Sequence, residues 1–434
     1  MKPFTKTISI PFVACVLILQ ASCVAPPEPS EFMIGTDMMS PDLYLIDTES
    51  DTRVRINLSK LPNWPGGLPL HTAILPDGRK AYLSVMSSDK DPLTILALRI
   101  GAIDWSARTA EVQITNVMRL EEPGAKPSML VPTQTDARQP VTDRWIPTNH
   151  QLHGPTIHPS AKFVYYTQWT ANKIRVIDVA TDRLAAIDPI QYGAGTRQLH
   201  GVFFNPAGEL AITTGFYFDL KDVTLYKVDK DTGNLTPAKV IPLTVNEKNK
   251  EYAAFSHFIH WLDNRYAITS TQQVGPTSLT PAGFTVIGPT VWLIDASEGQ
   301  AALIIGPAKE PDEAGIYKPA SDIMVIGDKL YVGEEDSMDE EVNADGYVSV
   351  WDFTDRTKPK FIKRLKPGKE LPQDFSMTHE LYSTQNGKYL YAQSWGSGHL
   401  VKIATANDEV VKAFSKEDAG WHMPHGNFVP GSLR

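Results

Sequence analysis

Histidine recurs at one position of a repeated pattern in this chain. In residues 379–384, His-Glu-Leu-Tyr-Ser-Thr, a histidine opens a short apolar run, and a turn signal follows about five residues later. The chain has only 11 histidines in 434 residues, yet six of them open runs of this kind, and a seventh run opens with an aspartate. The seven positions are His71, His153, His200, His257, Asp322, His379 and His425.

Six imidazoles on one register of a repeat predict a metal centre. Neutral imidazole is the commonest metal ligand in proteins, and nitrogen-rich sites suit copper, zinc, iron or nickel. Clustered imidazoles without a metal would repel one another when protonated. One ion cannot use seven such ligands, so we expect about two or three ions, with copper first in the affinity order. Two roles stay open for Asp322, as a ligand or as a carboxylate that orients an imidazole N–H.

These positions need a repeating fold, and the rest of the chain supplies the repeat. Strand candidates are short, rich in valine, isoleucine, tyrosine and phenylalanine, and separated by frequent turn signals. Segments 174–178, 291–295 and 348–352 are three copies of one strand, each ending in aspartate. The openings recur at intervals of 46–65 residues, apart from one interval of 82 residues that holds an insertion near residues 120–149. Such a period with four strands per unit predicts a β-propeller.

The two ends of the chain predict how the propeller closes. His425 opens a run that is followed by no second, third or fourth strand, whereas residues 32–58 supply three strands without a first. Pairing the two ends completes one blade and removes the exposed edge of an open sheet. We therefore predict an all-β, seven-bladed β-propeller over residues 32–434, closed by pairing of the N- and C-terminal strands in one blade.

The first 22 residues predict an export signal, because a basic start precedes a mostly apolar stretch. Cys23 follows two small residues, which is typical of a bacterial lipoprotein cleavage site, although Gln20 stands where that pattern prefers an aliphatic residue. Residues 23–31 form a proline-rich tether. We expect a periplasmic or cell-surface protein attached to the membrane only through a lipid on Cys23. Simple secretion and an uncleaved anchor stay open.

The composition argues against several classes of protein. Cys15 and Cys23 are the only cysteines, so the predicted propeller has no thiolate for an iron–sulfur cluster, covalent haem attachment or a cysteine-held metal. The formal net charge is −9, and no basic stripe suggests a nucleic-acid partner.

Polar and aromatic residues are expected around the mouth of the channel, where the second strands end. Segments 272–273 (Gln-Gln), 334–336 (Glu-Glu-Asp) and 393–395 (Gln-Ser-Trp) lie at such ends. Residues of these types suit a small-molecule substrate pocket. Glu335, as a general base, and Gln273 are the predicted catalytic residues, with Glu334 as the alternative base. The alternative for Glu335 is a solvated acidic loop, because acidic residues continue after it.

Because histidines open the inner strands of the seven predicted blades, the chain resembles the catalytic propeller of nitrous oxide reductase and the copper enzyme thiocyanate dehydrogenase. Residues 70–72 (Leu-His-Thr), followed by Asp77-Gly78 and Ala81-Tyr82, are similar to a channel-histidine segment of the former. The resemblance covers nearly the whole mature chain and implies that the six histidines bind a multinuclear copper centre. This chain departs from the pattern in lacking a cupredoxin domain with its two-cysteine copper site, and in carrying Asp322.

Two functions follow. The first is an exported copper-dependent oxidoreductase that acts on a small inorganic or sulfur- or nitrogen-containing substrate. Without the cupredoxin domain, N₂O reduction is not expected, and electrons would pass to a separate carrier, to substrate or to oxygen. The second is a non-catalytic metal-binding or scaffold lipoprotein. A sugar-lactone hydrolase is disfavoured, because hard cations prefer carboxylates and carbonyls to imidazoles.

Overall fold

The structure, a computed structural model, describes the strands of the fold and most of their turns. The described ranges are 31–37, 40–86, 93–120, 130–132, 145–147, 152–168, 173–191, 198–216, 222–246, 248–249, 251–253, 255–272, 285–335, 345–415 and 424–429. The signal peptide predicted at 1–22, Cys23 and nearly all of the tether lie outside these ranges, and so does Gln273. Within them, no helix is long and apolar enough to cross a membrane.

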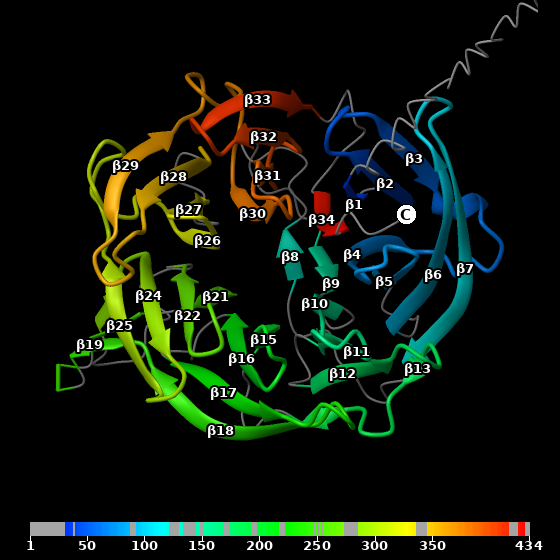
Figure 1. Ribbon diagram of the computed structural model, residues 1–434, viewed down its shortest axis with the longest axis horizontal. Coiled ribbons are helices and arrows are strands. Elements are labelled where there is room, and N and C mark those ends of the chain that lie inside the picture. Colours follow the sequence, from blue (N-terminus) through cyan, green and yellow to red (C-terminus); the bar gives the residue numbers. More distant parts are fainter. Residues whose placement is uncertain are drawn as a thin grey trace, which may run out of the picture.

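Seven antiparallel sheets surround one central axis as the blades of a propeller, which Figure 1 shows end-on. Blade 1 contains β4 (Leu68–Ile74), β5 (Lys80–Met86), β6 (Leu93–Asp104) and β7 (Thr109–Leu120). Blade 2 contains β10 (Leu152–Ile157), β11 (Phe163–Gln168), β12 (Lys173–Asp178) and β13 (Arg183–Leu184), with β14 (Ile190–Gln191) also on β12. Blade 3 contains β15 (Gln198–Phe204), β16 (Leu210–Phe216), β17 (Asp222–Val228) and β18 (Leu235–Pro242).

The remaining blades follow the same order from the innermost strand outward. Blade 4 contains β21 (Ser256–Trp261), β22 (Tyr266–Thr271), β24 (Thr290–Asp295) and β25 (Gln300–Ile305). Blade 5 contains β26 (Ala320–Ile326), β27 (Lys329–Glu334), β28 (Tyr347–Asp352) and β29 (Lys360–Leu365). Blade 6 contains β30 (Thr378–Ser383), β31 (Tyr389–Ser394), β32 (Leu400–Ala404) and β33 (Glu409–Phe414). Blade 7 contains β34 (Pro424–Val429), β1 (Phe32–Asp37), β2 (Asp42–Asp47) and β3 (Arg53–Asn57).

Blade 7 joins the two ends of the chain. Its innermost strand is the C-terminal β34, which pairs antiparallel with the N-terminal β1 and places His425 opposite Thr36. The predicted all-β, seven-bladed fold and its closure are therefore confirmed. Further short elements lie outside the seven blade sheets: the pair β8 (Leu130–Pro132) and β9 (Trp145–Pro147), the sheet of β19 (Thr244–Asn246), β20 (Glu251–Ala253) and β23 (Thr285–Ile287), and the 3₁₀ turn η1 (Leu58–Lys60).

Burial explains the residue pattern of the strands. Every residue of β2 and of β11 is buried, because a neighbouring blade covers each face of a middle strand. In the outermost β7, exposed residues largely alternate with buried or half-buried ones, because one side meets solvent. The core lies between blades, where Tyr82 of blade 1 and Tyr166 of blade 2 belong to one cluster.

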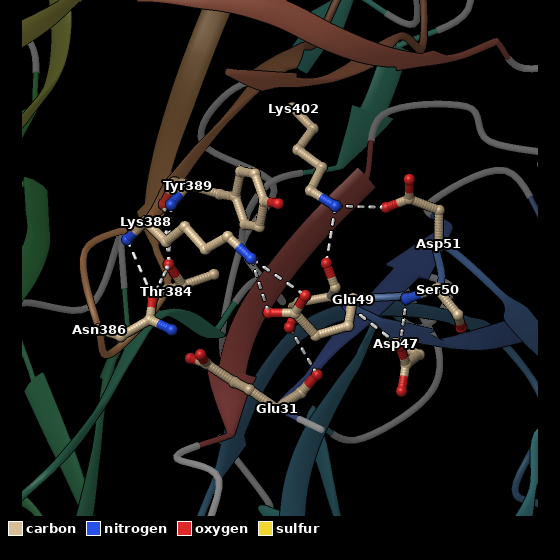
Figure 2. A network of polar contacts seen from close by, with 11 residues as sticks. Glu31, Asp47, Glu49, Ser50, Asp51, Thr384, Asn386, Lys388, Tyr389 and Lys402 are labelled. Atoms are coloured by element: carbon tan, nitrogen blue, oxygen red, sulfur yellow. Dashed lines mark hydrogen bonds and ion pairs between the residues drawn. The ribbon is translucent and has the colours of Figure 1, made fainter. Parts of the chain in front are cut away.

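Polar contacts join blade 6 to the N-terminal strands of blade 7 (Figure 2). The Lys402 ammonium donates to the Thr48 carbonyl at 2.7 Å, pairs with Asp51 at 2.8 Å and lies 4.0 Å from the centre of the Tyr389 ring. The Lys402 side chain is only 4% exposed. Lys388, in contrast, pairs with Glu49 at 3.2 Å between side chains that are about half exposed.

This difference predicts unequal contributions to stability. Lys402→Met keeps the aliphatic stem but removes a charged donor from the buried Thr48 carbonyl and from the partly buried Asp51 carboxylate, so we expect it to lower the free energy of unfolding by about 1–3 kcal/mol. Lys388→Met should cost at most about 1 kcal/mol, because its ion pair is exposed. Urea unfolding of the two variants measures both values, and equal losses would contradict the assignment.

His158 ties the turn after β10 to blade 3. Its Nε2–H donates to the Gly208 carbonyl at 2.9 Å, and its Nδ1 accepts the Ser160 N–H at 3.1 Å. Burial lowers the pKa of His158, and the charges of Lys230 and Lys162 add to this lowering while the bond to Gly208 partly offsets it.

The lowered pKa of His158 predicts a pH dependence of stability. The unfolded chain takes up the proton first as the pH falls, so the stabilisation is complete above about pH 6.5 and is lost below it. Urea unfolding should therefore show a steeper loss between about pH 7.5 and pH 5.5 for the wild type than for His158→Gln. The same slope in both proteins would speak against this role.

Candidate functional site

All seven predicted positions lie in the innermost strands of the blades. They are His71 in β4, His153 in β10, His200 in β15, His257 in β21, Asp322 in β26, His379 in β30 and His425 in β34. These strands contact one another in order around the axis, and β34 closes the circle onto β4. The fold thus brings the seven backbones around one centre. The side chains of His153 and His425 lie outside the described part of the site.

A β-bulge interrupts six of the seven inner strands beside these positions. The pairing shifts between Pro69 and Thr72, His153 and Thr156, Leu199 and Gly201, Ser256 and Ile259, Ala320 and Ile323, and Thr378 and Leu381. A bulge places an extra residue on one strand and re-aims its side chain, and bulges are common beside active sites. The repeated bulges therefore set which side chains meet at the centre.

Three buried histidines make a continuous line of ring contacts there. The ring centres of His200 and His257 are 3.9 Å apart, and those of His257 and His379 are 5.1 Å apart. His379 also stacks on the indole of Trp395, with the ring centres 4.7 Å apart. These rings come from blades 3, 4 and 6, so the contacts bring together residues that lie far apart in the sequence.

Oxygen atoms hold the Nδ1 atoms of two of these rings. His257 Nδ1 lies 2.7 Å from the Ser321 carbonyl oxygen. A carbonyl only accepts, so Nδ1 carries the proton and the ring lone pair is on Nε2. His379 Nδ1 lies 2.8 Å from Glu335 Oε2. A carboxylate or carbonyl bound to one imidazole nitrogen is the arrangement that orients metal-binding histidines.

Glu335 is buried between Gln272 and His379. Gln272 Nε2 donates to one oxygen of the carboxylate, and His379 contacts the other. Burial raises the pKa of Glu335, and His379 offsets this only in part. Burial alone would lower the pKa of His379, but the charge and hydrogen bond of Glu335 outweigh it and raise that pKa. The buried pair can hold a proton for transfer, and Glu335 itself is buried rather than solvated.

Asp322 is buried beside this cluster and binds main-chain groups. Its Oδ1 accepts the N–H of Ile323 at 2.7 Å, and its Oδ2 accepts the N–H of Leu381 on β30 at 2.8 Å. Burial raises the pKa of Asp322 to about 8, although both N–H groups act to lower it. His71 is also buried, and its backbone N–H donates to the Ser84 hydroxyl at 3.1 Å.

The donors fit copper in kind, because imidazole nitrogen is a preferred copper ligand. The positions of these donors do not by themselves form a metal site. Among the described side chains, no group of three or more His, Cys, Asp or Glu residues is arranged to hold a metal ion. The three contacting rings would have to rotate apart to share ions. The predicted ligand set stays a prediction.

The residue that directly follows the second strand makes the same backbone hydrogen bond in three blades. The backbone N–H of Gln272, Glu335 and Trp395 donates to the carbonyl of Phe255, Pro319 and Met377, respectively. Gln272 is thus the amide that the structure places against Glu335, whereas the predicted Gln273 lies outside the described residues. The sequence could have pointed to Gln272, because Gln272 directly follows the second strand of its blade, as Glu335 and Trp395 follow theirs. Leu70, for which the sequence predicted no role of its own, packs against Trp395.

No protein family model and no curated protein matches the chain. Solved structures do match. The periplasmic gluconolactonase of Pseudomonas aeruginosa is 12% identical over 92% of this chain and 99% of that chain, with a TM-score of 0.60. Hydrazine synthase of Kuenenia stuttgartiensis is 14% identical over 82% of this chain and 90% of that chain, with a TM-score of 0.51. A functionally unknown protein from Desulfotomaculum acetoxidans is 13% identical over 92% and 98%, with a TM-score of 0.59. At these identities the likeness shows that this chain shares the propeller fold, and function must be argued from the site.

Proposed function

We propose that this protein is an exported copper-dependent oxidoreductase, with more than one copper ion bound by histidines in the propeller channel. The observation that carries the proposal is the line of three buried imidazoles, two of which have their Nδ1 atoms held by oxygen. This leaves Nε2 as the coordinating nitrogen, which is the tautomer a metal needs. The ligands would be drawn from the seven predicted positions.

Copper bound there would supply one-electron chemistry and would polarise a small inorganic or sulfur- or nitrogen-containing substrate. The protein groups have separate tasks. Ser321 and Glu335 fix the orientation of His257 and His379, and Glu335 accepts or returns a proton through its buried carboxylate. Trp395 and Leu70 supply an apolar wall beside His379 that excludes water. Electrons would leave through a separate carrier, the substrate or oxygen.

Support for the cellular setting comes from the predicted export signal. An exported protein would encounter copper outside the cytoplasm, and a lipid on Cys23 would hold the protein at the membrane. One solved structure with a similar fold is a periplasmic gluconolactonase, so lactone hydrolysis is the outcome to exclude. The other alternative is a metal-binding or scaffold propeller without turnover.

A copper-loading experiment separates these functions. The purified full chain would be incubated with Cu(II), passed through a desalting column and analysed for copper, and its Cu(II) signal would be followed by electron paramagnetic resonance during addition of thiocyanate, sulfite or hydroxylamine. We expect more than about one copper per chain and loss of the Cu(II) signal with at least one reductant. Less than about one copper per chain would overturn the proposal.

Two other outcomes of these assays would assign the protein a different function. Bound copper with no redox change across the panel would identify a binding propeller. Metal-independent opening of gluconolactone, measured by acid release, would identify a lactonase.

A further inference from the structure

A groove opens on the outer side of the propeller. It lies between the loop that joins β3 to β4 and the outermost strand of blade 1, β7, at the right of Figure 1. Its volume is about 440 Å³, which is within the range of small-molecule pockets. The loop contributes Asn63, Trp64 and Pro65 to its lining, and β7 contributes Ile114, Val117 and Arg119 among others. The groove is therefore separate from the inner strands that carry the seven predicted positions.

A β-bulge in β7 sets which side chains face the groove. The register with β6 shifts at Thr115, which is the extra residue. Ile114, before the bulge, and Val117, after it, both pack in the cluster between blades 7 and 1, whereas Met118 belongs to the cluster of blades 1 and 2. Side chains of a strand alternate between its two faces, so Arg119 lies on the same face as Val117. The extra residue thus brings a guanidinium to the groove.

The loop holds an indole as one wall of the groove. Asn63, Gly66 and Gly67 have φ of 68°, 89° and 86°, in the left-handed region that asparagine and glycine tolerate best. The chain therefore turns on both sides of Trp64. The indole is half-buried and packs against the same apolar cluster as Val117. This packing fixes the ring while part of its surface lines the groove.

Two polar groups of the groove are available to a ligand. Within the described ranges, no hydrogen bond or ion pair engages the guanidinium of the exposed Arg119 or the indole N–H of Trp64. Asn116 is instead committed to the fold. Its amide donates to the Asp182 carbonyl at 2.6 Å and accepts the N–H of Val117 at 2.9 Å.

We propose that this groove is a second ligand site, which binds one ring of a sugar acid. The C–H face of the ring packs on the flat apolar surface of Trp64. The carboxylate pairs with Arg119, whose planar fork of donors matches two carboxylate oxygens. The hydroxyls bond to the Asn63 amide and to the Thr115 hydroxyl, which keeps its lone pairs while it donates to the Ala97 carbonyl at 3.1 Å. The site needs no metal and does not depend on the copper-binding function proposed above.

Binding of D-glucuronate to the metal-free full chain tests the proposal. D-glucose lacks the carboxylate and benzoate lacks the hydroxyls, so these two probes separate the contributions of the two kinds of contact. Calorimetric titration gives the three affinities. The indole N–H signals of ¹⁵N-labelled protein report the place of binding, and the signal that is missing in Trp64→Phe identifies Trp64. We expect glucuronate to bind most tightly and to shift that signal.

Matched variants test the two main contacts. Arg119→Gln should weaken glucuronate binding by roughly 10–100-fold, as for loss of a hydrogen bond to a charged group. Arg99→Gln is the control, because Arg99 lies on the same hairpin and already donates to Gln113 at 2.5 Å. It should leave the affinity unchanged. Trp64→Ala should remove detectable binding, whereas Trp64→Phe keeps an aromatic face and should retain binding.

Each result decides for or against the site. Binding of glucose or benzoate as tight as that of glucuronate would overturn the sugar-acid assignment. Equal losses in Arg119→Gln and Arg99→Gln would do the same, and so would glucuronate binding that leaves the Trp64 signal in place. No binding to the wild type at millimolar glucuronate would overturn the proposal as a whole. A thermal melt checks the fold of each variant, and Arg119→Gln, at an exposed position, provides the decisive comparison if Trp64→Ala does not fold.

Discussion

Replacing Arg364 with methionine is expected to lower the free energy of unfolding by about 3–5 kcal/mol, because it leaves the partner of a buried ion pair without its counter-charge. Arg364 Nε donates to Glu334 Oε1 at 3.0 Å, and neither side chain is exposed. The guanidinium also donates to the carbonyls of Gly315, at 2.5 Å, and of Pro311. One substitution therefore removes the donor of two buried acceptors, Glu334 and Gly315, and of the partly buried Pro311 carbonyl.

The second oxygen of Glu334 extends the effect toward the site. It accepts the N–H groups of Tyr317 and Lys318, at 3.0 and 3.1 Å, and so fixes the segment that leads into β26. Glu334 also precedes Glu335, which binds His379. Loss of Arg364 should thus loosen the support of the site as well as the fold.

Two matched variants test this reasoning by urea unfolding. Adding Glu334→Gln to Arg364→Met should restore part of the stability, because no buried charge then lacks a partner. Arg356→Met removes a half-exposed pair with Asp263 and should cost at most about 1 kcal/mol. If Arg364→Met and Arg356→Met unfolded at the same urea concentration, the buried pair would not have the predicted importance.

His379→Ala is expected to reduce copper affinity by about 100-fold or more, and Glu335→Gln by about 10–100-fold, as for a partner that orients a ligand. His379 contributes a ring that meets both His257 and Trp395, and its Nδ1 is held by Glu335. Competition with a copper chelator gives both affinities.

His399 offers a control within the same blade. It pairs with Asp374 at 2.8 Å and is not one of the seven predicted positions. His399→Ala should therefore leave copper affinity unchanged while removing one histidine from the chain. Copper content that is the same in His379→Ala and in the wild type would remove the basis of the histidine centre.

The sequence by itself determined the number of blades and how they close. The strands could be recognised because neighbouring blades bury both faces of each middle strand, which requires short apolar runs such as that of β11. The unmatched strands at the two ends predicted the pairing of β34 with β1. The concentration of histidines at the start of inner strands also needed no coordinates.

Only the tertiary structure decided which residues meet. Glu335 and His379 are 44 residues apart, and no local pattern pairs them. Gln272 and Glu335 are 63 residues apart, and their contact is likewise set by the packing of neighbouring blades. Asp322 aligns with His379 in the repeat, yet the bulge makes Ser321 its structural equivalent. A bulge adds one residue to one strand without altering the apolar pattern, and the sequence alone does not reveal that displacement.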